Sequence, residues 1–138
     1  MAHPILLASA ALVGLTAVVW ALALYERIGE MRARAISPQT LATSRERART
    51  LRRVQALDNF TNLFELPVLF YVLCLAVAVV GAETPALVGA AWVFVGLRVV
   101  HSLIHLTYNR VMHRFLVWTV GALWLFGMWI AFTIPLLG

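Results

Sequence analysis

Residues 58–74 read DNFTNLFELPVLFYVLC, a stretch that begins polar and becomes hydrocarbon within a few positions. Glu65 is the only charge between residues 63 and 81, so this segment is expected to enter a bilayer as a helix. On a continuous helix, Asp58, Asn62 and Glu65 would share one face, because their spacing is i, i+4, i+7. An ionisable group inside a membrane costs about 2.5–3.5 kcal/mol on insertion scales. Glu65 therefore either pairs with a neighbouring helix or serves a function, and this stretch leaves both interpretations open.

Composition places the whole chain in a membrane. Of its 138 residues, 62% are hydrophobic and 12% are charged. Soluble domains average about 45–50% apolar and about 25% charged residues. We therefore expect an all-α integral membrane protein that forms a single domain. All eleven basic residues are arginine, a bias that favours a GC-rich bacterial source.

Four apolar segments predict a four-helix bundle. The expected membrane spans cover approximately residues 5–27, 57–81, 85–108 and 114–137 of a single domain, 1–138. The first span lacks a basic segment before it, so we expect it to be retained rather than cleaved as a signal peptide. The single Cys74 lies in an apolar run and is expected to be buried and inert.

Between the first two spans lies a hydrophilic loop, residues 28–56, which we expect to be cytoplasmic. Residues 26–57 hold eight of the eleven arginines. Thr43 and Glu46 have the spacing of a capping box, which predicts a new helix that continues into the second span. We expect the arginines to set the orientation and to contact lipid headgroups. Nucleic acid is a poor partner, because the cluster belongs to a membrane hairpin rather than to a basic domain.

The loop charges predict the orientation in a bacterial inner membrane. The first loop is rich in arginine and the third carries Arg110, whereas the second carries only Glu83. By the positive-inside rule, the first and third loops face the cytoplasm. Both termini are then expected outside it.

A second polar stripe lies in the third span. Arg98, His101, His105 and Tyr108 are spaced i, i+3, i+7, i+10 and share one helical face. A short second loop makes spans two and three antiparallel neighbours, so the two polar stripes have matching depths. Because an unpaired arginine inside a membrane is costly, we expect Glu65 and Arg98 to form an ion pair.

Three interpretations of these stripes compete. They could form a structural polar seam, a metal site built on His101 and His105, or a site for an anionic ligand. Arg98 and Arg114 would place positive charge beside a metal ion, so no metal site is predicted. Arginine, asparagine, histidine and tyrosine donors suit an anion, and charge therefore favours the third interpretation.

These motifs together resemble the MAPEG family, the membrane-associated proteins of eicosanoid and glutathione metabolism. The resemblance rests on four spans, a long basic first loop, Asn62-x-x-Glu65 and Arg98-x-x-His101. The stretch from Asn62 to Tyr71 is similar to the version found in bacterial members. The resemblance implies a homotrimer that binds glutathione as a co-substrate between adjacent protomers, in the cytoplasmic half of the membrane.

The resemblance also implies roles for single residues. Asn62 and Glu65 would contact the glutathione peptide, and Arg98 and His101 would continue the polar pocket. Arg114 would stabilise the glutathione thiolate. The further candidates for ligand contact are His105, Tyr108 and, more loosely, Arg32.

Two functions remain open at this stage. One is glutathione-dependent transfer to, or peroxide reduction of, a lipophilic electrophile. The alternative is a non-catalytic lipid-binding or scaffold protein that keeps the same fold. The partners expected in either case are further copies of this chain and lipids or lipophilic small molecules.

The loop charges make a topological prediction. A reporter fused near Gln39 should be active on the cytoplasmic side, and one fused near Glu83 on the opposite side. Paired fusions of a cytoplasmic and a periplasmic reporter measure this directly. The reverse pattern would contradict the orientation.

Overall fold

The computed structural model describes residues 3–137, which are almost entirely helical. They form α1 (Pro4–Ala33), η1 (Pro38–Leu41), α2 (Ser44–Thr50), α3 (Gln55–Asn62), α4 (Leu66–Val80), α5 (Pro85–Leu106), α6 (Val111–Thr133) and η2 (Ile134–Leu136), where η marks a 3₁₀ helix. The expected all-α class is confirmed.

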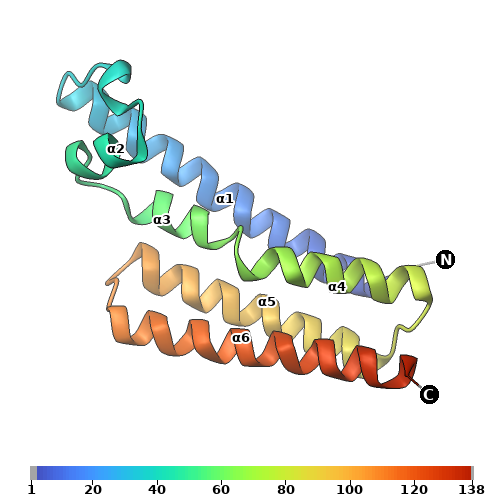
Figure 1. Ribbon diagram of the computed structural model, residues 1–138. Coiled ribbons are helices and arrows are strands. Elements are labelled where there is room, and N and C mark those ends of the chain that lie inside the picture. Colours follow the sequence, from blue (N-terminus) through green and yellow to red (C-terminus); the bar gives the residue numbers. More distant parts are fainter. Residues whose placement is uncertain (1–2, 138) are drawn as a thin grey trace.

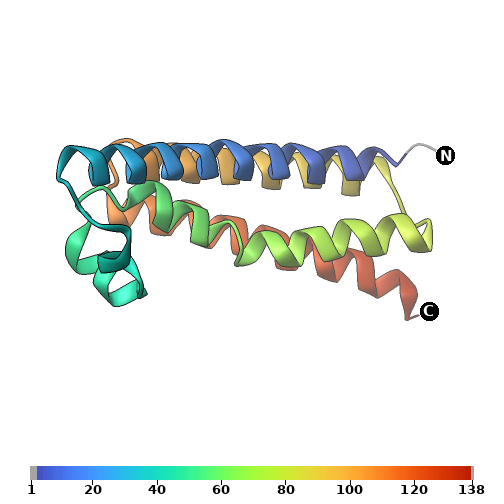
Figure 2. The ribbon, with the colours of Figure 1, turned by 90° about the horizontal axis from the view of Figure 1, so that it is seen from above.

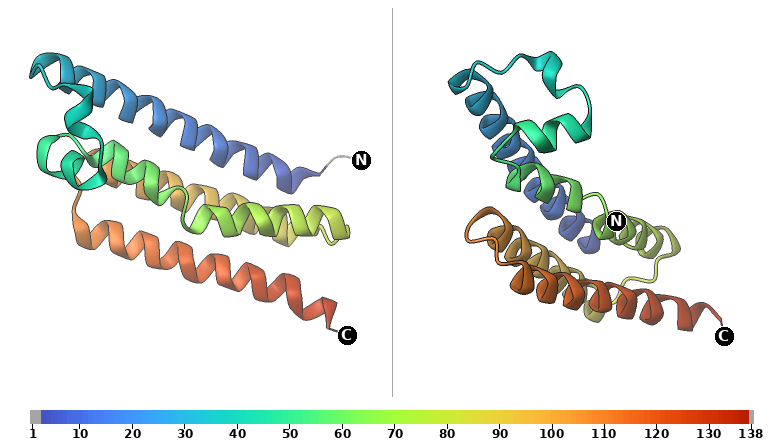
Figure 3. Two further views of the ribbon diagram at one scale, coloured as in Figure 1. Left: turned by 45° about the horizontal axis from the view of Figure 1, so that its top comes forward. Right: turned by 60° about the vertical axis from the view of Figure 1, so that its left-hand side comes forward.

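Four helical segments are long and apolar enough to cross a membrane. They are α1, α3 with α4 (Gln55–Val80), α5, and α6 with η2 (Val111–Leu136). They run roughly side by side as a four-helix bundle (Figures 1 and 3). α1 packs on α3, α4 and α5, while α6 packs mainly on α5. The short helices of the first loop gather at one end of the bundle, together with the α5–α6 turn (Figure 2).

The helix ends at the opposite end of the bundle follow from local sequence. Gly81 caps the end of α4. Its φ of 71° is left-handed, a backbone conformation that glycine adopts at little cost in free energy. The Thr84 side chain then accepts a hydrogen bond from the Leu87 N–H at 3.1 Å, and Pro85 occupies the first turn of α5. Tight capping at both ends of this short connection makes α4 and α5 antiparallel.

An apolar core joins all four spans. The Phe70 ring on α4 stacks on the Phe94 ring of α5, with centroids 4.7 Å apart, and both side chains are fully buried. Ile5, on α1, and Leu125, on α6, are also fully buried in this cluster. Cys74 lies in it as well, as expected.

The second span is broken between α3 and α4, so the expectation of one continuous helix is wrong. α3 ends at Asn62 and α4 begins at Leu66, and a turn covers residues 63–65. Proline at position 67 has no N–H and its ring clashes with the carbonyl four residues earlier, which breaks a helix at this point. Asp58, Asn62 and Glu65 therefore do not lie on one uninterrupted helical face.

The first loop folds as a compact cap. The capping box of α2 is present: the Thr43 N–H and hydroxyl both donate to Glu46, and Thr43 Oγ1 accepts from the Glu46 N–H at 3.2 Å. The hydrogen bond from the Thr43 hydroxyl, and next the one from the Thr43 N–H, hold the pKa of the Glu46 carboxyl below its ordinary value. α2 nevertheless ends at Thr50, and residues 51–54 are not helical. The expected continuation from the capping box into the second span is thus also wrong, because this segment bonds to the end of α1 instead.

The core stack yields a prediction on stability. Phe70→Ala should lower the free energy of unfolding by about 3 kcal/mol, because it removes the stack on Phe94 and leaves a void that lipid cannot fill. Val79→Ala is the matched control on the same helix, since Val79 is 85% exposed, and it should cost less than about 0.5 kcal/mol. Denaturant unfolding in detergent measures both. Equal losses would contradict the packing described.

Candidate functional site

A polar cavity opens beside the break between α3 and α4. Its volume is about 360 Å³, within the range of roughly 300–1,000 Å³ that is usual for small-molecule sites. It is lined by residues from the α3–α4 break, α5 and the first turns of α6: Asn62, Glu65, His101, Val111, Arg114, Phe115 and Trp118. Four of the residues singled out in the sequence thus meet at one place, at the end of the bundle that carries the cap.

Arg98 lies behind this cavity and is 1% exposed. Its Nη2 donates to the carbonyl oxygen of Asn62 at 3.3 Å. Its Nε and Nη1 are buried and have no hydrogen-bond partner within residues 3–137. A buried guanidinium with unused donors is costly for the fold, and Arg98 is not among the residues that line the cavity.

The expected ion pair between Glu65 and Arg98 is not found within the described part of the chain. Glu65 lies in the turn before α4, where its exposed side chain forms part of the cavity wall. The break in the helix is the reason, because it replaces the regular helical geometry that would have placed Glu65 opposite Arg98. The carbonyl of Asn62 takes that place instead.

The two histidines of the third span have different surroundings. His101 lines the cavity, is 1% exposed, and its Nδ1 has no partner among the described residues. His105 does not line the cavity, and its Nδ1 donates to the Gln55 carbonyl oxygen at 2.9 Å. His101 is therefore available to a ligand, whereas His105 links α5 to the start of α3.

Further polar contacts join α3 to α5 away from the cavity. The Ser102 hydroxyl donates to Asn59 Oδ1 at 3.3 Å, and both side chains are buried. Sequence analysis did not single out this pair. Together with the bond between His105 and Gln55, it forms the polar seam that was one interpretation of the sequence.

Arg114 lies in the first turn of α6 and is half-buried. Its Nη1 donates to Asn109 Oδ1 at 2.9 Å, and Asn109 has the left-handed φ of 45° that asparagine tolerates better than most residues. The α5–α6 turn therefore orients the guanidinium that lines the cavity.

Besides Arg98 and His105, two further predicted ligand residues do not line this cavity. Arg32 is exposed near the end of α1, and the Tyr108 hydroxyl lies 3.1 Å from His113 Nδ1. Conversely, sequence analysis assigned no role to the apolar wall of α6, formed by Val111, Phe115 and Trp118. Their i, i+4, i+7 spacing was the signal that could have identified this face.

A larger cavity of about 860 Å³ lies at the opposite end of the bundle, between α5 and α6. Its lining is almost wholly apolar, and its one ionisable residue, Glu83, accepts a hydrogen bond from the Ile5 N–H at 3.3 Å. No three histidine, cysteine, aspartate or glutamate side chains within the described residues gather closely enough to hold a metal ion. The polar cavity gathers several polar side chains, whereas the one ionisable residue of the apolar cavity is already hydrogen-bonded. The polar cavity is therefore the better candidate for a functional site.

Comparison with known protein families shows to which family the chain belongs. A sequence model of the MAPEG family matches residues 5–134, nearly the whole chain. The chain belongs to the MAPEG family. Neither curated proteins nor solved structures gave a match.

Membership confirms the resemblance read from the sequence motifs and accounts for the four apolar helices. This MAPEG protein is an integral membrane protein of the glutathione and eicosanoid metabolism type. The match also includes every residue that lines the polar cavity, since these lie between positions 62 and 118.

The two histidines of this MAPEG protein allow a direct comparison. His105→Phe should lower the free energy of unfolding by about 1–3 kcal/mol, because it leaves the Gln55 carbonyl without its donor. His101→Phe should cost less, because the Nδ1 of His101 has no partner to lose. Denaturant unfolding of both variants in detergent gives the order, and a larger loss for His101→Phe would contradict the assignment.

Proposed function

We propose that the protein is a glutathione-dependent transferase or peroxidase that acts on a lipophilic electrophile. The polar cavity supports this proposal most directly, because it gathers the side chains of Asn62, Glu65, His101 and Arg114 at one place. Glutathione carries carboxylates, an ammonium group and a thiol. Arginine binds carboxylates strongly because its charge is permanent and its donors are fixed in a plane.

Each polar residue of the cavity suits one part of the peptide. The Glu65 carboxylate is exposed on the cavity wall and suits the ammonium group. The Asn62 amide and His101 suit its carbonyl and carboxylate oxygens. Arg98 supplies positive charge from behind this wall, through donors that the chain itself leaves unused.

Arg114 is the residue we propose for activation of the thiol. A reference thiol has a pKa of about 8.5, so glutathione is mostly protonated near neutral pH, whereas its thiolate is the nucleophile. A fixed cation beside the sulfur favours the thiolate, and arginine keeps its own charge in that role. The bond from Arg114 to Asn109 orients the guanidinium beforehand.

The apolar side of the cavity suits a substrate that arrives from the bilayer. Val111, Phe115 and Trp118 form this wall on α6, and Phe115 is 54% exposed on the surface of the single chain. A lipophilic electrophile dissolved in the membrane could therefore reach the thiolate laterally. His101, which also lines the cavity, could donate a proton to the leaving group.

We further propose that the protein functions as a homotrimer with glutathione between adjacent protomers. α4 exposes Val68, Val72, Leu75 and Val79, a face that either lipid or another copy of the chain can cover. In a trimer, Arg32 and Tyr108, which do not line the cavity of their own chain, could approach the cavity of a neighbour.

A non-catalytic lipid-binding or scaffold role is the alternative. The bonds between Ser102 and Asn59 and between His105 and Gln55 form within the chain without any ligand, and Asn59 Nδ2 is left without a partner among the described residues. That observation suits a bundle that keeps its polar groups for packing alone.

The test uses the purified protein in detergent. Arg114→Ala should lower turnover of glutathione with a model aryl halide or lipid hydroperoxide by about 10²-fold, because the thiolate loses its stabilising cation. Glutathione affinity, measured by calorimetric titration, should change little. Arg110→Ala is the matched control, since Arg110 is exposed in the same turn and does not line the cavity.

Two results separate the candidate functions. If the wild-type protein binds glutathione and increases the ultraviolet absorbance of its thiolate, the enzyme proposal stands. If it neither binds glutathione nor changes the titration of the thiol, the scaffold role replaces the enzyme.

A further inference from the structure

The positive charge of the chain is concentrated in the cap. Residues 26–57 hold eight arginines and three glutamates, which leaves a formal charge of +5, the same as the net charge of the whole chain. The remaining charged residues cancel. The end of the bundle that carries the cap is therefore strongly basic, and the rest of the protein is neutral overall.

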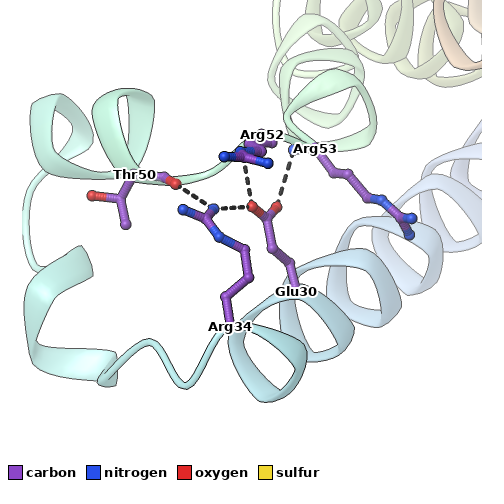
Figure 4. Close-up of polar contacts among 5 residues, drawn as sticks. All are labelled: Glu30, Arg34, Thr50, Arg52 and Arg53. Carbon is purple, nitrogen blue, oxygen red and sulfur yellow. Dashed lines mark hydrogen bonds and ion pairs between the residues drawn. The ribbon is translucent and has the colours of Figure 1, made fainter.

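Glu30 organises the centre of this cap (Figure 4). Its carboxylate is 7% exposed and accepts the backbone N–H of Arg52 at 2.8 Å and that of Arg53 at 3.0 Å. It also pairs with Arg34, whose Nη1 donates to the Thr50 carbonyl at 2.7 Å. One buried carboxylate thus fixes the returning chain against the last turns of α1.

This arrangement leaves two guanidinium groups unused. Glu30 bonds to the backbone of Arg52 and Arg53, not to their side chains, which are both exposed. Neither guanidinium makes a hydrogen bond or ion pair within residues 3–137. In Figure 4 the Arg53 side chain extends away from the Glu30 carboxylate. Fixed backbones with free cationic side chains lose less conformational entropy when they bind an anion than mobile ones do.

Helix geometry places these arginines at the level of the lipid headgroups. The apolar run from Ile5 to Tyr25 is about 31 Å long at 1.5 Å per residue, which matches a hydrocarbon core of about 30 Å. Glu30 lies five residues beyond it, or about 7.5 Å, and the headgroup layer on each side is roughly 5–8 Å thick. The backbone of Arg52 and Arg53, bonded to Glu30, lies at the same level.

We propose that Arg52 and Arg53 form a binding site for the phosphate groups of anionic phospholipids, and that Glu30 positions it. The guanidinium group binds phosphate well because of its charge and its planar set of donors. Membrane lipid is the occupant because the site lies in the headgroup layer, where phosphate is the abundant anion. This role is independent of the polar cavity and of glutathione.

The test measures lipid-dependent stability of the full chain. The protein is placed in nanodiscs of phosphatidylcholine with or without phosphatidylglycerol, and the Tm is measured in each. Phosphatidylglycerol should raise the Tm of the wild type, and this rise should be largely lost in the double variant Arg52→Gln, Arg53→Gln. In a direct binding measurement each arginine should account for roughly a fivefold change in affinity.

The matched control is the double variant Arg45→Gln, Arg49→Gln. It removes the same charge from the same cap, at two exposed positions on α2 that do not bond to Glu30. Its rise in Tm with phosphatidylglycerol should stay close to that of the wild type. Equal losses in the two double variants would show a diffuse charge effect and overturn the proposal.

Glu30→Gln separates an organised site from charge alone. The substitution makes the cap more positive, so simple attraction predicts stronger binding of phosphatidylglycerol. The proposed site predicts weaker binding, because the backbone of Arg52 and Arg53 loses its anchor. The rise in Tm is taken relative to the same variant in phosphatidylcholine, so a loss of basal stability does not affect the result. Stronger binding would overturn the proposal.

Inorganic phosphate provides the last comparison. It should not reproduce the rise in Tm at concentrations that match the phosphate of the lipid, since the site is held at the membrane surface. An equal rise with inorganic phosphate, abolished by Arg52→Gln, Arg53→Gln, would identify a free anion as the ligand and contradict the assignment to lipid.

Discussion

The hydrogen bond from Arg98 to the Asn62 carbonyl is the contact on which the polar half of the bundle depends. Inside a bilayer no water satisfies a backbone carbonyl, so a broken helix needs a donor from a neighbouring element. Pro67 breaks the second span, and the Asn62 carbonyl lies at that break. The Nη2 of Arg98 reaches it from α5 at 3.3 Å. The Glu65 N–H also donates to this carbonyl at 3.3 Å, so Arg98 adds a second bond at the break, and the carbonyl in turn accepts one of its buried donors.

The same break determines what lines the cavity. In an unbroken helix, Asn62 and Glu65 would be held by regular helical geometry, whereas in the structure Asn62 ends α3, Glu65 lies in the turn that follows, and both contribute to the wall. The opposite wall depends on the α5–α6 turn, where Asn109 accepts from Arg114. Two irregular segments, far apart in sequence, therefore create a polar cavity beside a core that is mostly apolar.

Much of this architecture could be predicted from the sequence. Long apolar runs identify the spans, Thr84 and Pro85 mark the start of α5, and Thr43 with Glu46 marks the start of α2. These signals depend on residues that are close in sequence, so tertiary contacts do not change the elements that they predict. Spacing and charge brought Asn62, Glu65 and His101 to one candidate site, the family resemblance added Arg114, and the structure places all four around one cavity.

The errors arose where tertiary contacts override local pattern. Helical spacing of apolar residues predicted one helix from α2 into the second span, but Glu30 captures the backbone of Arg52 and Arg53 and interrupts it. Charge complementarity predicted an ion pair between Glu65 and Arg98, but a backbone carbonyl took the place of the carboxylate. Sequence patterns describe side chains, and in both cases the deciding partner was a backbone group.

These contacts explain why arginine, rather than lysine, suits several positions in this chain. Arg98 is buried beside a carbonyl, Arg34 bridges Glu30 and the Thr50 carbonyl, and Arg114 is oriented by Asn109. Each role needs several N–H donors in fixed directions and a charge that persists away from water, which lysine supplies less well. The chain leaves such donors unused at Arg98 within the bundle and at Arg52 and Arg53 in the cap, within the residues that the structure describes. Under the two proposals, depth distinguishes the partners: a peptide would occupy the cavity within the bundle, and lipid headgroups would surround the cap.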